Sequence, residues 1–94
     1  MPDYTRRTTW PAINPQNTTS VTFGAAHQES GAISADAVRL CATAACYVAF
    51  GSIATSGSMY LPANVPEIFP FNSGDVISVL QASAGGTLYA SWGD

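Results

Sequence analysis

After about residue 20, hydrophobic and polar residues alternate in short runs along the chain. Gly, Ser, Asn and Pro separate the runs at intervals of roughly 8–12 residues, a spacing typical of β-sandwiches and barrels. We therefore expect an all-β fold, a small antiparallel β-sandwich or a jelly-roll-like barrel of six to seven strands. The predicted strands are 21–23, 38–42, 46–50, 59–61, 68–71, 76–81 and 87–92.

Four of these runs predict two β-hairpins: 38–42 with 46–50, and 76–81 with 87–92. In the first hairpin Leu40 would lie opposite Val48, with both side chains on the core face. Run 68–71 contains Pro70, which confines it to a sheet edge or a bulge.

Segment 35–49 has a helical alternative because it is rich in Ala, the best helix former. Its β-branched and aromatic residues, such as Val38, Tyr47 and Val48, suit a pleated surface better. We therefore interpret the segment as strands.

The first 18 residues predict an extended N-terminal arm ahead of a single β-sandwich domain at 19–94. The arm contains three prolines and no regular hydrophobic periodicity, so it becomes ordered only where something holds it. Trp10 and Ile13 are its apolar residues, and a Trp is costly to leave in water. They are expected to dock on the domain itself or on a neighbour.

Charged residues are scarce, at 10% of the chain, with three Arg, no Lys and a net charge of −3. This composition suits a protein whose surface is largely covered by partners, and a core this small often depends on oligomerisation. Binding to nucleic acid needs clustered basic residues, which the sequence lacks. No apolar run approaches the ~20 residues of a membrane helix, so no membrane association is expected.

Cys41 and Cys46 are expected to be free thiols. In the hairpin register Cys46 lies opposite Ala42, which leaves Cys41 on the outer face. A disulfide needs both Cβ atoms on one face at about 3.5–4.5 Å. Two thiolates alone cannot complete a tetrahedral zinc site.

We predict no catalytic site, metal or cofactor. His27 is the only histidine, so one chain cannot assemble a multi-histidine metal site. The acidic residues Asp36, Glu67 and Asp75 fall in separate turns, and no pair stands out as general acid and base. Glu67 lies in an apolar stretch, where a carboxylate needs a partner. Arg39 is the only Arg in the β region, so we expect a Glu67–Arg39 pair, within or between subunits.

Several runs in order resemble small β-sandwich accessory virion proteins of tailed bacteriophages, over roughly residues 20–92. The matching runs are Ala-Val-Arg-Leu-Cys-Ala-Thr at 37–43, Cys-Tyr-Val-Ala-Phe-Gly at 46–51, Met-Tyr-Leu-Pro-Ala at 59–63, Pro-Glu at 66–67, Gly-Asp-Val at 74–76 and Gly-Thr-Leu-Tyr at 86–89. The resemblance implies a non-catalytic capsid decoration or cement protein, commonly a homotrimer, that clamps the major capsid protein. It also implies manufacture in the host cytoplasm and a final location on the capsid surface.

If the chain is a decoration protein, we expect the N-terminal arm to contact the capsid protein and the strands to form the contacts between subunits. The expected partner-binding residues are Arg6, Arg7, Trp10 and Ile13. The expected subunit contacts are Arg39, Tyr47, Tyr60, Glu67 and Tyr89. Each aromatic residue could instead pack within its own domain.

Two other functions stay open. One is a tail or baseplate component, and the other is a carbohydrate-binding attachment module that uses exposed aromatics.

Overall fold

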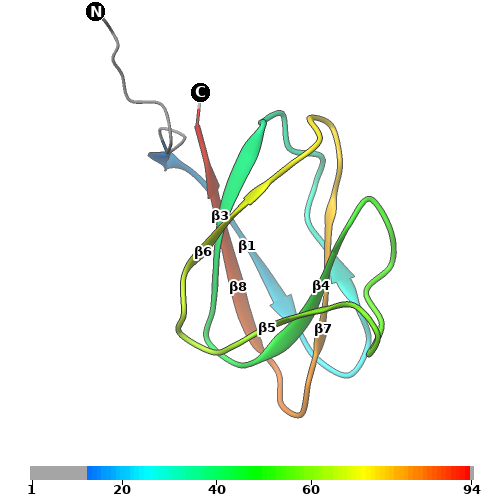
Figure 1. The fold of residues 1–94 in the computed structure, drawn as a ribbon. Helices are drawn as coiled ribbons and strands as arrows, with labels where there is room; N and C mark the ends of the chain where they lie inside the picture. The colour runs from blue at the N-terminus through cyan, green and yellow to red at the C-terminus, as the bar shows by residue number, and fades with distance from the viewer. Residues whose placement is uncertain (1–12, 94) are drawn as a thin grey trace, which may run out of the picture.

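The computed structural model describes residues 13–93, which form eight strands and no helix (Figure 1). The all-β prediction is confirmed. The described residues contain no helix of the length and apolarity that a membrane crossing requires. The strands are β1 (Asn14–Phe23), β2 (Gln28–Glu29), β3 (Ala37–Ala42), β4 (Cys46–Phe50), β5 (Met59–Leu61), β6 (Glu67–Pro70), β7 (Ile77–Gln81) and β8 (Gly86–Trp92).

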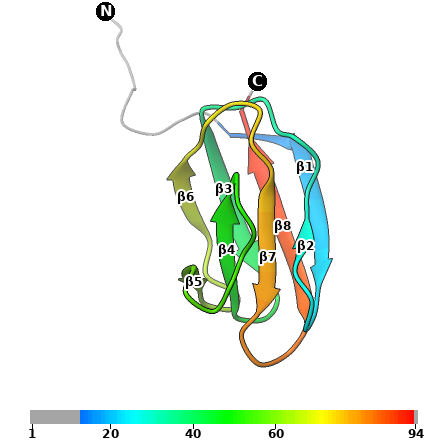
Figure 2. The ribbon, with the colours of Figure 1, turned by 90° about the vertical axis from the view of Figure 1, so that its right-hand side faces the viewer.

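Two four-stranded antiparallel sheets face each other (Figure 2). Their strand orders are β1-β8-β3-β6 and β2-β7-β4-β5. The pairs β1–β8, β2–β7, β3–β6 and β4–β5 nest inside one another along the chain. The chain stays in one sheet only between β4 and β5 and changes sheet at every other connection. This is the strand order of a jelly roll.

The predicted hairpins are both wrong, because their strands lie in opposite sheets. Strand β3 pairs with β6 and β8, whereas β4 pairs with β5 and β7. Residues 43–45 cross from one sheet to the other between β3 and β4, and we call them the crossing between β3 and β4. Hydrogen bonds join this crossing to strands or loops of both sheets. The Thr43 N–H donates to the Thr87 carbonyl at 2.9 Å, and the Ala45 carbonyl accepts from the Ala82 N–H at 3.2 Å. A crossing of this kind needs the same alternating pattern as a hairpin, which explains the error.

The core lies between the sheets and takes alternate residues from each strand. Leu40 and Val48 both face it, as predicted, but from opposite sheets. Their side chains therefore pack across the sandwich and not across a hairpin. The largest fully buried apolar side chains are Leu40, Leu61, Ile77, Leu88, Val38, Val48 and Val79.

Strand β1 begins at Asn14, so the predicted boundary after residue 18 falls inside this strand. Its pairing with β8 shifts register between Asn14 and Thr18. The Thr18 hydroxyl donates to the Pro15 carbonyl at 2.7 Å across this irregularity. Ile13 is partly buried just before the strand. Arg6, Arg7 and Trp10 lie outside the described residues.

The edge position predicted for the Pro70 strand is confirmed. Strand β6 is the edge of its sheet, with Pro66 immediately before it and Pro70 at its end. Because Pro has no N–H to donate, both ends of this edge resist pairing with a further strand. Residues 13–93 also contain the two-residue strand β2, where the sequence predicted no strand, so they form eight strands and not the expected six to seven.

Candidate functional site

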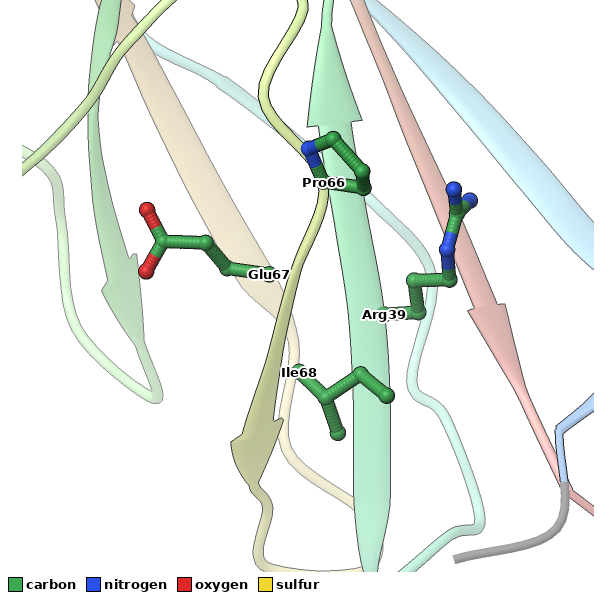
Figure 3. Close-up of a pocket in the computed structure, with 4 residues that line it drawn as sticks. All are labelled: Arg39, Pro66, Glu67 and Ile68. Atoms are coloured by element: carbon green, nitrogen blue, oxygen red, sulfur yellow. The ribbon is translucent and has the colours of Figure 1, made fainter. Parts of the chain in front are cut away.

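A shallow pocket lies on the β3–β6 side of the first sheet. Its lining residues are Arg39, Pro66, Glu67 and Ile68, and its volume is about 420 Å³ (Figure 3). Arg39 lies between the buried residues Val38 and Leu40, so its side chain points to the outer face. We call these four lining residues the arginine pocket.

The two charged residues of the arginine pocket do not meet each other. In the β3–β6 register Arg39 lies opposite Ile68, whereas Glu67 lies opposite Leu40. Opposed residues share a face, and neighbours along a strand alternate. The Arg39 and Glu67 side chains therefore project in opposite directions, as Figure 3 shows. Within residues 13–93 neither takes part in an ion pair. The prediction of this pair within one chain is wrong, and a pair between subunits stays a prediction.

Tyr89 projects from the same outer face of the first sheet. It lies opposite Cys41 on β3 and Ser20 on β1, and it is 47% exposed. An exposed Tyr in the middle of a sheet with little charge resembles the aromatic anchors of protein interfaces. Its predicted contact with another subunit is untested, but the residue is available for one.

The second sheet carries its own aromatic surface. Tyr47 on β4 lies opposite Tyr60 on β5, and their ring centroids are 5.9 Å apart at an interplanar angle of 63°. This edge-to-face arrangement is favourable for aromatic pairs. Tyr60 is 54% exposed, and Leu80 flanks Tyr47 on the other side. We call Tyr47, Tyr60 and Leu80 the tyrosine patch.

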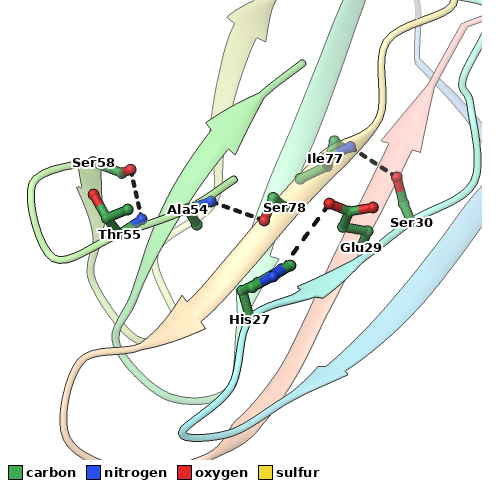
Figure 4. Close-up of polar contacts among 8 residues, drawn as sticks. All are labelled: His27, Glu29, Ser30, Ala54, Thr55, Ser58, Ile77 and Ser78. Carbon is green, nitrogen blue, oxygen red and sulfur yellow. Dashed lines mark hydrogen bonds and ion pairs between the residues drawn. The ribbon is translucent and has the colours of Figure 1, made fainter. Parts of the chain in front are cut away.

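A buried serine fastens a loop over part of the same outer face. Ser78 is fully buried on β7, and its hydroxyl accepts a hydrogen bond of 2.9 Å from the Ala54 N–H (Figure 4). Ala54 is buried, but its neighbour Ile53 is 57% exposed. The serine bond therefore fixes an apolar side chain in a position open to partners. The sequence analysis predicted neither this hydrogen bond nor the loop that it holds.

Replacing Ser78 with alanine is expected to lower the free energy of unfolding by about 1–3 kcal/mol, because the buried Ala54 N–H loses its acceptor. Urea denaturation measures this change. The matched control is Ser83→Ala in an exposed turn, which should change the free energy by less than about 0.5 kcal/mol. Equal effects of the two substitutions would contradict the role given to Ser78.

The remaining titratable residues do not form a reactive cluster in the part of the chain that the structure describes. His27 Nδ1 lies 4.0 Å from Glu29 Oε2, and both side chains are well exposed (Figure 4). No group of three or more His, Cys, Asp or Glu among residues 13–93 is arranged to hold a metal ion. The candidate functional sites among residues 13–93 are therefore the exposed surfaces of the two sheets.

The cysteines are both free, for a reason other than the predicted one. Cys41 lies on the outer face of β3 and is partly buried, whereas Cys46 is fully buried on β4 in the other sheet. They are separated by the crossing between the sheets and are not hairpin neighbours. Burial raises the pKa of the Cys46 thiol from 9.0 to about 11.

This raised pKa predicts a loss of stability in alkali. The unfolded chain releases the Cys46 proton near pH 9 and the folded chain only near pH 11. Between these values the folded state binds more protons, so the free energy of unfolding falls by up to roughly 1.4 kcal/mol per pH unit. Denaturation from pH 8 to pH 11 should show a weaker decline for Cys46→Ala. Parallel curves for both proteins would contradict the prediction.

Comparisons of the chain with protein-family models, with curated proteins and with solved structures found no match. The functional inference therefore rests on the surfaces described above.

Proposed function

We propose that this chain is a non-catalytic structural protein of a bacteriophage virion, a capsid decoration or cement subunit that binds the major capsid protein lattice. The observation that carries the proposal is the character of the outer faces. Tyr60 and Tyr89 are exposed on these faces, and Arg39 is the only Arg or Lys at positions 13–93. Protein interfaces are enriched in aromatic residues and depleted of Lys. The exposed large apolar residues are Ile53, Met59, Tyr60, Val65 and Tyr89.

The jelly roll supports this function because it is a rigid scaffold with two separate faces. Viral capsid and lectin domains use this architecture, although a fold alone does not determine a function. The arginine pocket and Tyr89 lie on one sheet, and the tyrosine patch lies on the other. A subunit with two such faces can contact a neighbouring copy and a capsid protein at the same time.

The stabilising mechanism would be burial of apolar surface at repeated contacts. Each square ångström of apolar surface removed from water contributes about 25 cal/mol. A contact of about 800 Å² on each partner is typical of stable complexes, and linking several contacts in one oligomer raises the overall avidity. We further propose that the subunit is a homotrimer and that Arg6, Arg7, Trp10 and Ile13 contact the capsid protein.

Cosedimentation with expanded capsids that lack the protein tests this function. Bound protein should reach a plateau at a fixed number of copies per capsid. Tyr60→Ser should weaken binding by about tenfold, or ~1.4 kcal/mol, because the loss of a subunit contact lowers the avidity of the oligomer for the capsid. The control is Thr55→Ala, an exposed position in the nearby loop. Failure of the unmodified protein to sediment with capsids would contradict the proposal.

The tyrosine patch favours one alternative function, a carbohydrate-binding attachment module on the virion. Exposed aromatic rings provide apolar stacking surfaces with a polar tip, and Tyr60 is exposed beside Tyr47. Titration with host surface glycans, followed by tyrosine fluorescence, tests this function. Saturable glycan binding that Tyr60→Ser abolishes, together with no capsid binding, would favour this alternative over the cement function.

A further inference from the structure

We propose that two copies of this chain associate edge to edge through strand β1, with the two β1 strands antiparallel and paired about Ser20. The contact joins the β1-β8-β3-β6 sheets of both copies into one continuous sheet. The inference goes beyond the proposed function, because the contact involves neither a capsid protein nor a third subunit.

Strand β1 is the least protected of the four strands that lie at sheet edges. It contains ten residues, whereas the other edge strands β2, β5 and β6 contain two, three and four. Proteins prevent unwanted pairing at an edge with short strands, charged residues and prolines. The short edges carry such residues: Glu29 in β2, Pro62 after β5, and Pro66 and Pro70 at the ends of β6. Residues 18–23 of β1 contain neither a charge nor a proline, so this edge is open to the addition of a strand.

The contacts of Thr87 on β8 show which backbone groups of β1 face its partner strand. The Thr87 carbonyl accepts a hydrogen bond from the Thr43 N–H, and the Thr87 N–H donates to Thr43 Oγ1, both at 2.9 Å. Thr87 therefore faces β3. In an antiparallel sheet both backbone groups of a residue point to the same neighbour, and successive residues alternate. Leu88 therefore faces β1, and the opposite residue Val21 faces β8.

Thr18, Ser20 and Thr22 alternate with Val21, so they direct their N–H and C=O groups away from β8. Strand β1 pairs with no other strand among residues 13–93, and no other hydrogen bond of these residues engages the six groups. All three residues are exposed, and β1 forms the outer edge of its sheet (Figure 2). A strand placed beside β1 can therefore reach a regular row of donors and acceptors.

A second copy of β1 fits this row because the three residues are symmetric about Ser20. In an antiparallel pairing Ser20 meets Ser20 of the second copy, and Thr18 meets Thr22. Each pair then exchanges two hydrogen bonds. Like charges directly opposite each other would destabilise such a pairing, but this segment has none. Pairs of threonines across neighbouring strands are favourable, so the side chains on the outer face support the same register.

The number of chains in the contact follows from the edges that remain. An antiparallel pairing of identical strands is two-fold symmetric and therefore closed. The opposite edge of the joined sheet is β6 in both copies, where Pro66 and Pro70 prevent the addition of a further strand. The contact therefore produces pairs and not fibres. Copies that also associate in threes would form an assembly of six chains.

Replacing Ser20 with proline tests the proposal. The proline removes the N–H at the two-fold axis, and its ring occupies the position of the second strand. An edge strand tolerates proline where the N–H faces away from the sheet. Ser20→Pro should weaken association by at least about tenfold, because both copies lose a central hydrogen bond. Light scattering of the full-length protein at up to about 1 mM should show half the mass, a monomer from a dimer or a trimer from six chains.

The matched control is Ser20→Ala, which changes the side chain at the same position but keeps the N–H. It should associate as the unmodified protein does. Circular dichroism checks that each variant is folded. A folded Ser20→Pro variant with the mass of the unmodified protein would overturn the inference, as would an unmodified protein that is monomeric at the highest concentration.

Disulfide crosslinking tests the register without a proline. Ser20→Cys should form a crosslinked dimer under mild oxidation, since the Cα atoms of a hydrogen-bonded pair lie about 5.5 Å apart, a distance that a disulfide can span. The control Thr22→Cys lies on the same edge, but it faces Thr18 of the second copy. Its two thiols are too far apart along the strands to react. Peptide mass spectrometry distinguishes a bond between the introduced thiols from one formed by Cys41.

Absence of the crosslink at position 20, or equal crosslinking at positions 20 and 22, would contradict the pairing about Ser20. None of these results bears on capsid binding, which cosedimentation measures separately. Failure of the inference is therefore distinguishable from failure of the proposed function.

Discussion

Replacing Leu88 with alanine is expected to lower the free energy of unfolding by about 3–5 kcal/mol. Leu88 is fully buried on β8, between Val21 of β1 and Ala42 of β3. Removing its side chain loses apolar burial and leaves a cavity that the surrounding sheets can fill only in part. A domain of this size has roughly 5–15 kcal/mol of stability in total, so the variant should lie close to the limit of folding.

Urea denaturation and thermal unfolding measure this effect, with a fall in Tm of at least about 10 °C. The adjacent substitution Tyr89→Ala is the control because Tyr89 points outward and is half exposed. It should change the free energy of unfolding by less than about 1 kcal/mol. If both substitutions had the same effect on unfolding, the assignment of the inner and outer faces of β8 would be wrong.

Replacing Gly86 with alanine is expected to destabilise the fold by about 1–3 kcal/mol through overpacking. A Cβ atom at Gly86 would lie 2.7 Å from Thr43 Oγ1 and 2.9 Å from Ala44 Cβ. Thr43 Oγ1 also accepts a hydrogen bond of 2.9 Å from the Thr87 N–H. The added methyl group would therefore displace the crossing between β3 and β4 from the start of β8.

The comparison for this prediction is Gly31→Ala. A Cβ atom there meets nothing within 4 Å, and Gly31 is not in the left-handed region. Alanine at this site should be neutral or should stabilise the protein by up to about 1 kcal/mol, since it restricts the unfolded chain. A larger loss of stability from Gly31→Ala than from Gly86→Ala in chemical denaturation would contradict the close packing described at the crossing.

The sequence predicted the faces of the strands better than their partners. Alternation placed Leu40 and Val48 in the core, where the structure has them, because a strand with one buried face must repeat with a period of two. The same alternation predicted that Leu40 and Val48 lie in one hairpin, although they belong to opposite sheets. Residues 43–45 could turn back within one sheet and form a hairpin, or cross to the other sheet. The alternating pattern of the flanking strands is the same in both cases, so it does not predict which strands pair.

The candidate surfaces could be predicted only in part. Residue types identified Arg39, Glu67 and the exposed tyrosines, but only the β3–β6 register shows that the two charges lie on opposite faces. Ser78 and Ala54 were missed because their hydrogen bond joins positions 24 residues apart through a loop of irregular conformation. Local periodicity carries no information about such contacts.

The most direct test of the proposed function is cryo-electron microscopy of expanded capsids incubated with the purified protein. The cement function predicts added density of trimeric shape at lattice-symmetric positions, with nearly full occupancy and with capsids that withstand heating better than bare ones. Bare capsids at saturating protein concentration, indistinguishable from untreated ones in density and heat resistance, would contradict it.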